Sequence, residues 1–323
     1  MSQPHYAGSY AWQSSPHIRQ GDTVPAIMYT VVAALIPATA GAVVFFGVDA
    51  LRVVALALFS TMATEFVFLK ARKKDLSALR DGSAFITGLL LALTLPPGLK
   101  SSYVVIGGVV SIALGKQIFG GLGCNIFNPA LVGRAFLQGA FPVAMTTWST
   151  ALAKVDATTA ATPLGGFKFA HIVPALKPMI VGNIGGCLGE TSALLILLGG
   201  LILVFRRCLD WKIPLTILAT VGLVSSGYYL LNPTTAASPL VHLFGGGLLF
   251  GAVFMATDMV TSPITPIGTL VYAFGIGLLV FVIRVFGGLP EGVMYSILIM
   301  NSVVPLLNRF TRPRPFGARQ EAA

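Results

Sequence analysis

The sequence predicts an all-α membrane protein that crosses the bilayer several times. Hydrophobic residues make up 55% of its 323 residues and charged residues only 10%, whereas soluble domains carry about 25% charged residues. Most apolar stretches run to about 20 residues, the length of a membrane-spanning helix. Runs that alternate apolar and polar residues are absent, so helices rather than strands must satisfy the backbone within the lipid.

Ten membrane spans are expected, of which the third and fifth are short or interrupted by proline and glycine. They fall near 25–47, 50–70, 83–97, 102–118, 128–144, 185–205, 212–231, 239–257, 266–285 and 290–308. The polar N-terminus, 1–24, contains no apolar segment of the kind found in cleavable signal peptides. A loop at 145–184 divides the spans into two sets of five, 25–144 and 185–308. A basic tail, 309–323, ends the sequence.

Basic residues gather in three clusters, at 70–74, at Arg206-Arg207 and at 309–319. Such clusters lie on the cytoplasmic side of a membrane protein. If the N-terminus is cytoplasmic and the ten spans alternate, all three clusters reach that side and loop 145–184 lies outside. The net charge of +10 therefore indicates topology and contact with lipid rather than nucleic-acid binding.

Two pairs of short motifs indicate an internal repeat. Thr94-Leu95-Pro96 resembles Thr261-Ser262-Pro263, and Phe119-Gly120-Gly121-Leu122 recurs at the same offset as Phe286-Gly287-Gly288-Leu289. Five spans separate the copies. Because five is an odd number, the two halves are expected to be inverted relative to each other, as in many transporters and channels. The alternative is a chance match between glycine-rich apolar segments.

The segment 119–133 contains four glycines and one proline between the fourth and fifth spans. Irregular backbone at membrane depth is tolerated only where protein covers it or a cavity adjoins it. Asn125 and Asn128 supply amide donors and acceptors there, so the break could hold a cofactor ring or an ion. A tight re-entrant turn that only packs explains the same pattern.

Three carboxylates, Glu65, Glu190 and Asp258, fall within or at the ends of expected spans. A carboxylate at the bilayer centre costs roughly 2.5 to 3.5 kcal/mol on insertion scales, so it usually has a partner or a function. These residues are candidates for a cation path, and interhelical hydrogen bonds or interfacial caps are the structural alternative. Arg134 and Arg284 can extend to an interface, and Arg134 can instead face a phosphate or a carboxylate.

No residue pattern marks a metal centre or a catalytic side chain. Cys124, Cys187 and Cys208 lack the spacing of a metal site. Phosphate-binding loops, dinucleotide fingerprints and nucleophile elbows are absent from the sequence.

The segment 156–164 is small, polar and rich in threonine, unlike the rest of the chain. Asp156 is its only carboxylate, and the small neighbours of Thr162 are expected to leave its hydroxyl accessible. Taken alone, this is an ordinary Thr/Ala-rich loop. However, Asp156-x-x-Thr159-Ala-Ala-Thr162 resembles the acceptor site at which a flavin transferase attaches FMN, through a phosphoester to the final threonine. That site is typical of the NqrB/RnfD family of membrane redox subunits.

Other blocks carry the same resemblance. They are the Gly-Gly-Leu-Gly to Asn-Pro-Ala break, the stretch from Phe141 to Trp148 and the Met-Ala-Thr-Asp run that ends at Asp258. The resemblance extends from about residue 25 to residue 307, and the short length is nearer to RnfD than to NqrB. One departure is Ala160, which stands where many relatives have glycine.

The resemblance implies a urea-channel-like fold and a subunit of an ion-translocating ferredoxin:NAD oxidoreductase in a bacterial inner membrane. It implies FMN bound covalently to Thr162, with Asp156 and Thr159 as parts of the acceptor pattern. A second, non-covalent flavin, riboflavin or FMN, is implied near Asn125 and Asn128. Electron transfer would be coupled to Na⁺ or H⁺ translocation. The implied partners are a flavin subunit (G), membrane subunits (A and E), iron–sulfur subunits (B and C) and a flavin transferase.

Two other functions fit parts of the sequence. An inverted repeat with paired helix breaks also suits a stand-alone channel or transporter for a small polar solute, because fold alone does not determine function. A scaffold that only holds redox partners together is the third possibility. A flavin acceptor at Thr162 separates the redox subunit from both, since neither alternative needs one.

Overall fold

The structure, a computed structural model, describes residues 23–148, 162–170, 172, 174–182, 184–190, 192–233, 236–288 and 291–313. All regular secondary structure in these ranges is helical, which confirms the all-α prediction. The reason is that a helix satisfies its own backbone hydrogen bonds and needs no partner in lipid.

Six helices among the described residues are long and apolar enough to cross a bilayer, so the chain is a multi-pass membrane protein. They are α1 (Val24–Phe46), α2 (Val48–Ala71), α4 (Ser101–Ala113, continued by the 3-10 turn η2, Gln117–Phe119), α10 (Lys212–Leu231), α13 (Pro266–Phe286) and α14 (Val293–Phe310). Large apolar side chains such as Phe59, Leu223 and Phe274 are exposed on them. That surface suits contact with lipid tails.

The other four expected spans are shorter or divided. The span expected at 83–97 contains only α3 (Ser83–Leu93), which ends before Pro96 and Pro97. The span expected at 128–144 is divided into α5 (Pro129–Ala140) and α6 (Pro142–Met145). Proline explains both interruptions, because it lacks the N–H group that would continue a helix.

Glycine-rich segments interrupt the remaining two. The span expected at 185–205 begins with a 3-10 turn, η3 (Leu188–Glu190), and becomes helical in α9 (Ala193–Phe205). The span expected at 239–257 is divided into α11 (Pro239–Phe244), α12 (Leu248–Phe250) and a π-helical turn, η4 (Gly251–Met255). π-helical turns occur frequently at functional sites.

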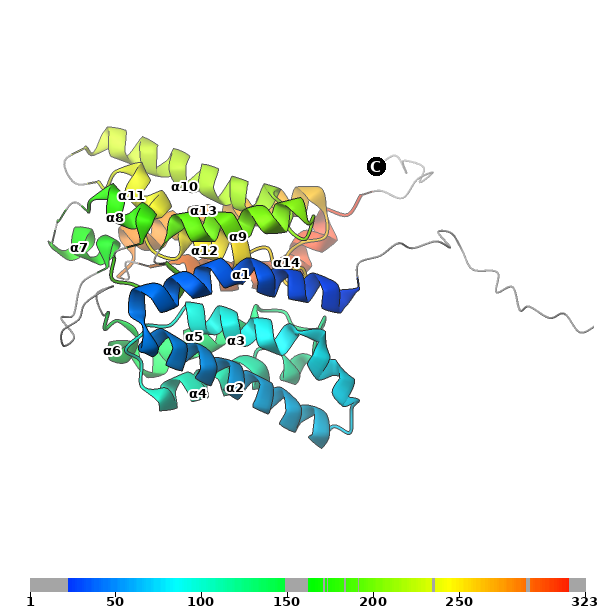
Figure 1. Cartoon of the computed structure of the whole chain (residues 1–323). Coiled ribbons are helices and arrows are strands. Elements are labelled where there is room, and N and C mark those ends of the chain that lie inside the picture. Colours follow the sequence, from blue (N-terminus) through cyan, green and yellow to red (C-terminus); the bar gives the residue numbers. More distant parts are fainter. Residues whose placement is uncertain are drawn as a thin grey trace, which may run out of the picture.

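Three short elements complete the described chain. A 3-10 turn, η1 (Leu76–Asp81), follows α2, and α7 (Pro163–Ala170) and α8 (Leu176–Val181) lie within the loop expected at 145–184. Figure 1 shows α6, α7 and α8 at one end of the bundle. The start of α1 and the end of α14 lie at the opposite end.

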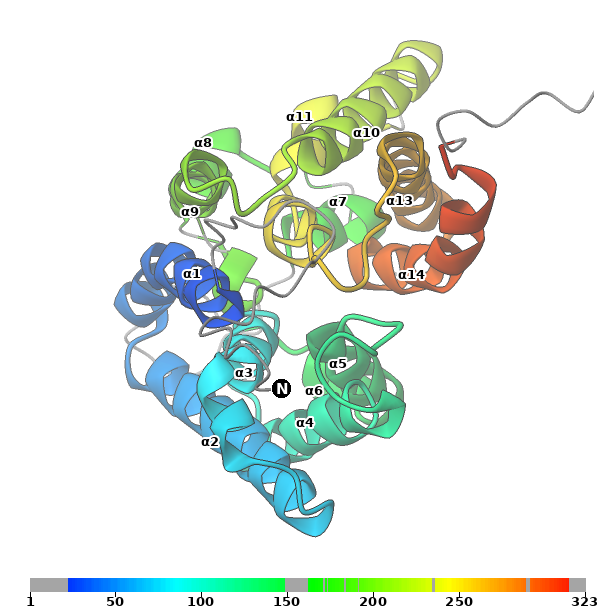
Figure 2. The same ribbon diagram turned by 90° about the vertical axis from the view of Figure 1, so that its right-hand side faces the viewer.

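The helices form two groups that meet along two seams. Viewed end-on, α1 to α6 lie on one side and α8 to α14 on the other (Figure 2). The helix α1 contacts α9 at one seam, and α5 contacts α14 at the other. The broken elements α3, α12 and η4 are almost entirely buried. The two groups share one hydrophobic core, so the helix breaks lie inside the protein rather than against lipid.

Candidate functional site

Thr162 stands at the N-terminus of α7. Its hydroxyl oxygen accepts a hydrogen bond from the backbone N–H of Gly165 at 3.1 Å. The side chain is buried, with 4% of its surface exposed, whereas the sequence predicted an accessible hydroxyl. The hydroxyl is also engaged rather than free, because it caps the first turn of the helix. Asp156 and Thr159 fall outside the described residues.

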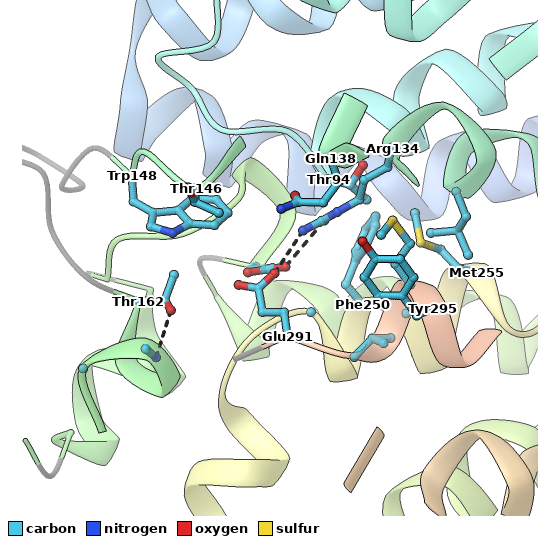
Figure 3. A pocket seen from close by; sticks show the side chains of 18 of the residues that line it. Thr94, Arg134, Gln138, Thr146, Trp148, Thr162, Phe250, Met255, Glu291 and Tyr295 are labelled. Carbon is cyan, nitrogen blue, oxygen red and sulfur yellow. Dashed lines mark hydrogen bonds and ion pairs between the residues drawn. The ribbon is translucent and has the colours of Figure 1, made fainter. Parts of the chain in front are cut away.

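Thr162 lines a cavity of about 400 Å³, here called the Thr162 cavity. Its volume lies in the range of about 300 to 1,000 Å³ that small-molecule sites have. Thr146 and Trp148 lie across from Thr162, and Arg134 and Glu291 lie further along the cavity (Figure 3). Much of the remaining wall is apolar or aromatic, with contributions from Phe169, Phe250, Met255 and Tyr295.

Three charged side chains meet in the wall of this cavity. The guanidinium of Arg134, on α5, donates to Glu291 Oε2 at 3.0 Å and lies 3.9 Å from Glu190 Oε1. Arg134 and Glu190 are buried, and Glu291 is half-buried. Glu190 ends the turn η3, and Glu291 lies two residues before the start of α14. The cluster therefore joins the two helix groups.

Glycine allows these groups to approach. A Cβ atom added to Gly247, just before α12, would lie 2.7 Å from Glu190 Oε1. Arg284 lies close by, but it does not extend to an interface as the sequence suggested. It is buried and donates to the carbonyl oxygens of His242 and Gly245. These carbonyls end the short helix α11 and otherwise lack intrahelical partners, which is why the guanidinium stays inside.

The same cluster contains Cys187, whose sulfur lies within 4.8 Å of carboxylate oxygens of Glu190 and Glu291. This spacing would allow a cation to bind, but the positively charged guanidinium of Arg134 already lies beside both carboxylates. Sequence reasoning did not single out Glu291. The available signal was that it is one of only 11 acidic residues and lies at the start of the expected span 290–308.

A second, smaller cavity lies among the helix breaks and is here called the Asn128 cavity. Its volume is about 90 Å³, and Lys116, Asn125, Asn128 and Asp258 are among its lining residues. The structure thus brings together the two asparagines and one of the three carboxylates that the sequence singled out. It also adds Lys116, which sequence reasoning missed.

The polar groups of the Asn128 cavity already have local partners. Asn128 caps α5 by accepting from the N–H groups of Ala130 and Leu131. Its amide also donates to the carbonyl of Met255 at 3.3 Å. Asn125 donates to the carbonyl of Phe127 at 3.1 Å. At about 90 Å³, the cavity is smaller than pockets for small molecules generally are, so this chain alone does not enclose a flavin there.

Asp258 is half-buried and holds a local turn. One carboxylate oxygen accepts from the N–H of Val260, and the other accepts from the hydroxyl of Thr261, both at 3.2 Å. The structural alternative named for this residue, a cap at the end of a span, matches these contacts.

Glu65 lines neither cavity and lies in a buried ion pair. Its Oε1 atom accepts from Lys116 Nζ at 2.9 Å and from Gln117 Nε2 at 2.8 Å. Lys116 also donates to the hydroxyl of Ser83 at 2.6 Å. Glu65 is 3% exposed and Lys116 is 2% exposed. The pair therefore connects α2, α3 and the turn after α4, and its Lys116 end adjoins the Asn128 cavity.

Comparison with known proteins shows the family to which the chain belongs. The model of the NQR2, RnfD, RnfE family matches residues 11–317. The chain belongs to the NQR2/RnfD/RnfE family. This confirms the resemblance found in the acceptor pattern and the helix breaks.

Three curated relatives are all D subunits of translocating oxidoreductase complexes. The chain is 45% identical to the D subunit of the proton-translocating ferredoxin:NAD(+) oxidoreductase complex of Clostridium ljungdahlii, over 95% of this chain and 96% of the relative. It is 44% identical to the D subunit of the Na(+)-translocating ferredoxin:NAD(+) oxidoreductase complex of Acetobacterium woodii, over 94% of each chain. It is 42% identical to the D subunit of the ion-translocating oxidoreductase complex of Stutzerimonas stutzeri, over 91% of this chain and 92% of the relative.

Proposed function

We propose that this chain is the D subunit of an ion-translocating ferredoxin:NAD⁺ oxidoreductase (Rnf) complex. In this proposal it passes electrons through FMN bonded to Thr162 and helps couple them to Na⁺ or H⁺ movement. Near full-length similarity to D subunits at 42 to 45% identity supports the assignment. The partners would be the G, A, E, B and C subunits of the complex.

The observation that carries the flavin proposal is the position of Thr162. Its hydroxyl lies both at the N-terminus of α7 and on the Thr162 cavity. A phosphoester formed there would place its negative charge at a helix N-terminus, which favours anions. Pro163 suits the first helical position, since its missing N–H is one of those left unpaired there.

The cavity beside the hydroxyl also suits a flavin ring. Its volume of about 400 Å³ and its aromatic wall fit a flat apolar ring, and Arg134 supplies a positive charge. When bound, the flavin would supply the electron-transfer chemistry, while the protein fixes its position and tunes its potential. Because Thr162 is buried, we expect the transferase to act before the chain around α7 has packed, or while it is displaced.

Ultraviolet fluorescence of the denatured protein on a gel tests the proposal directly. Wild-type chain from a host that expresses the flavin transferase should give a fluorescent band, and Thr162→Val should give none, because valine has no oxygen to esterify. The matched control is Thr158→Val, which removes a hydroxyl from the same segment but leaves the acceptor pattern intact. It should stay fluorescent.

A dark wild-type band, with the transferase shown to act on a control substrate, would overturn the flavin proposal. The solute channel or the scaffold would then be the better explanation of the fold. If the band stays fluorescent in Thr162→Val and is lost in another threonine variant, that other threonine carries the flavin.

We further propose that the protein contains two inverted five-helix repeats, with both termini in the cytoplasm and the acceptor segment outside. The order of elements supports this: α1, α2, α4 and α5 have counterparts in α9, α10, α13 and α14 at nearly the same offset. Figure 1 places the start of α1 and the end of α14 at the end of the bundle opposite α7. The basic clusters 70–74 and 206–207 fit that topology under the positive-inside rule.

The residues that line the two cavities bear on the ion path and on the second flavin. We propose that Glu190 and Asp258 take part in ion movement, because each lines one of the two cavities. Glu65 is the less suitable candidate, since it lines neither cavity and Lys116 already neutralises it. A second flavin near Asn125 and Asn128 would have to lie partly against another subunit, because the cavity in this chain is too small.

Single substitutions in the assembled complex separate these roles. Glu190→Gln and Asp258→Asn should lower Na⁺- or H⁺-coupled transport several-fold while the covalent flavin remains. Glu65→Gln should mainly lower stability. The measurement is ion uptake by vesicles during ferredoxin oxidation. Wild-type uptake in the Glu190 and Asp258 variants would remove both residues from the path.

A further inference from the structure

Arg134 is the one cationic side chain that the described residues place in the wall of the Thr162 cavity. Its side chain is nine-tenths buried, at 10% exposure. Two carboxylates hold it, one from each of two separate segments: Glu291 at 3.0 Å and Glu190 at 3.9 Å. A planar guanidinium fixed by two acceptors has little freedom to move, so its position relative to the cavity is set before any ligand arrives.

Arg134, Glu190 and Glu291 together carry one net negative charge when all three are ionised, because one guanidinium faces two carboxylates. Arg284 adds a second positive charge nearby. A Cβ atom added to Gly246 would lie 3.3 Å from Arg284 Nη2 and 3.7 Å from Glu291 Cγ, so both side chains pack against this glycine. Charges in such a buried place interact more strongly than in water. Any electron brought into the cavity must therefore be felt by this cluster.

We propose that Arg134 sets the reduction potential of the flavin on Thr162, by facing the ring and stabilising the negative charge that reduction brings. This rests on the proposed function. The pyrimidine edge of a flavin carries oxygen and nitrogen acceptors and one N–H donor, so a guanidinium held beside a carboxylate complements it. Charge near that edge is a recognised way to tune a flavin. Glu190 and Glu291 are positioning residues that hold the guanidinium.

The Glu291 carboxylate supports a role beyond packing. Its Oε1 atom is buried and has no hydrogen-bond partner among the described residues. A carboxylate that only joined α5 to α14 would be expected to use both oxygens, since an unpaired buried acceptor is unfavourable. Glu291 also lines the Thr162 cavity, so its unpaired oxygen belongs to a side chain that a bound ring would contact.

The test is a redox titration of the covalently bound flavin in the full-length chain, after non-covalent flavin has been removed. One electron passes from the titrating reductant, dithionite, to the ring at each step, and no bond to the protein forms or breaks. Arg134→Gln should lower the midpoint potential, because it removes a positive charge. Glu291→Gln should raise it, because it removes a negative charge. The double variant should return close to wild type.

A tenfold change in the ratio of reduced to oxidised flavin at a fixed potential is the expected size in each single variant, or about 59 mV for one electron. Arg134→Lys keeps the charge and should recover most of the lost potential. The control is Asp49→Asn, an exposed carboxylate at the start of α2 that does not line the cavity. It should leave the potential unchanged.

Opposite shifts distinguish electrostatic tuning from a structural role, since loosening the seam between α5 and α14 would move both single variants in the same direction. Shifts of one sign, or no shift in either, would overturn the inference. If a single variant fails to fold, the double variant still tests the inference, because it removes one positive and one negative charge and so keeps the cluster's net charge. Covalent flavin in all variants with unchanged midpoint potentials would contradict this inference but not the proposed function. Absence of covalent flavin from the wild type would contradict the proposed function itself.

Discussion

Replacement of Thr162 by valine should reduce ferredoxin-dependent NAD⁺ reduction by the assembled complex to its background rate. Valine keeps the shape and the burial of the side chain but offers no oxygen for the phosphoester. The variant also removes the hydroxyl that caps α7, which costs about 1 kcal/mol. That cost is too small to unfold the protein, so the expected loss reflects the missing flavin.

The measurement is the rate of NAD⁺ reduction by purified complex, with co-purification of all subunits as the check on assembly. Thr158→Val should retain the wild-type rate. Full activity in Thr162→Val without bound flavin would contradict the electron-relay function and favour a scaffold. Full activity with a flavin still attached would show that another residue accepts it.

Replacement of Lys116 by methionine should destabilise the protein by about 3 to 5 kcal/mol, because removing one member of a buried ion pair leaves the other charge uncompensated. Glu65 would keep only the amide of Gln117 on its Oε1 atom, and its Oε2 atom already lacks a partner among the described residues. Ser83 would lose its bond from Lys116 as well.

Unfolding by sodium dodecyl sulfate, followed by helical circular dichroism, measures this effect. Two further variants show whether the pair is the cause. Lys70→Met, at the exposed end of α2, should change stability by less than about 0.5 kcal/mol. The double change of Lys116→Met with Glu65→Leu should recover much of the loss, because it removes both buried charges. A Lys116→Met protein as stable as the wild type would mean that water reaches Glu65.

Fold class could be predicted from the sequence because it depends on apolar length alone. The six long helices α1, α2, α4, α10, α13 and α14 lie within a few residues of their expected bounds. The divided spans were predictable in part. Proline and glycine in the spans expected at 83–97 and 128–144 indicated short or interrupted helices, and the helices there end before Pro96 and Pro142. The breaks within 185–205 and 239–257 were not expected, because apolar composition continues through Gly245 and does not show where the backbone leaves the helix.

The candidate site was predictable in parts. Thr162, Arg134 and Glu190 stood out singly, as a threonine in a polar segment and as charges in apolar surroundings. Their shared cavity did not, because Arg134 and Glu291 are far apart in sequence and meet only where α5 packs beside α14. The pairing of Glu65 with Lys116 was missed for the same reason, since it depends on how α2 lies against α4.

One helix belongs to both cavities. Asn128 caps the start of α5 on the Asn128 cavity, and Arg134 extends from the same helix into the Thr162 cavity. Six residues of α-helix span about 9 Å, and no hinge interrupts α5 between them. Asn128 also donates to the backbone carbonyl of Met255, and Met255 lines the Thr162 cavity. A rigid displacement of α5 along its axis would therefore move a wall residue of each cavity by the same distance.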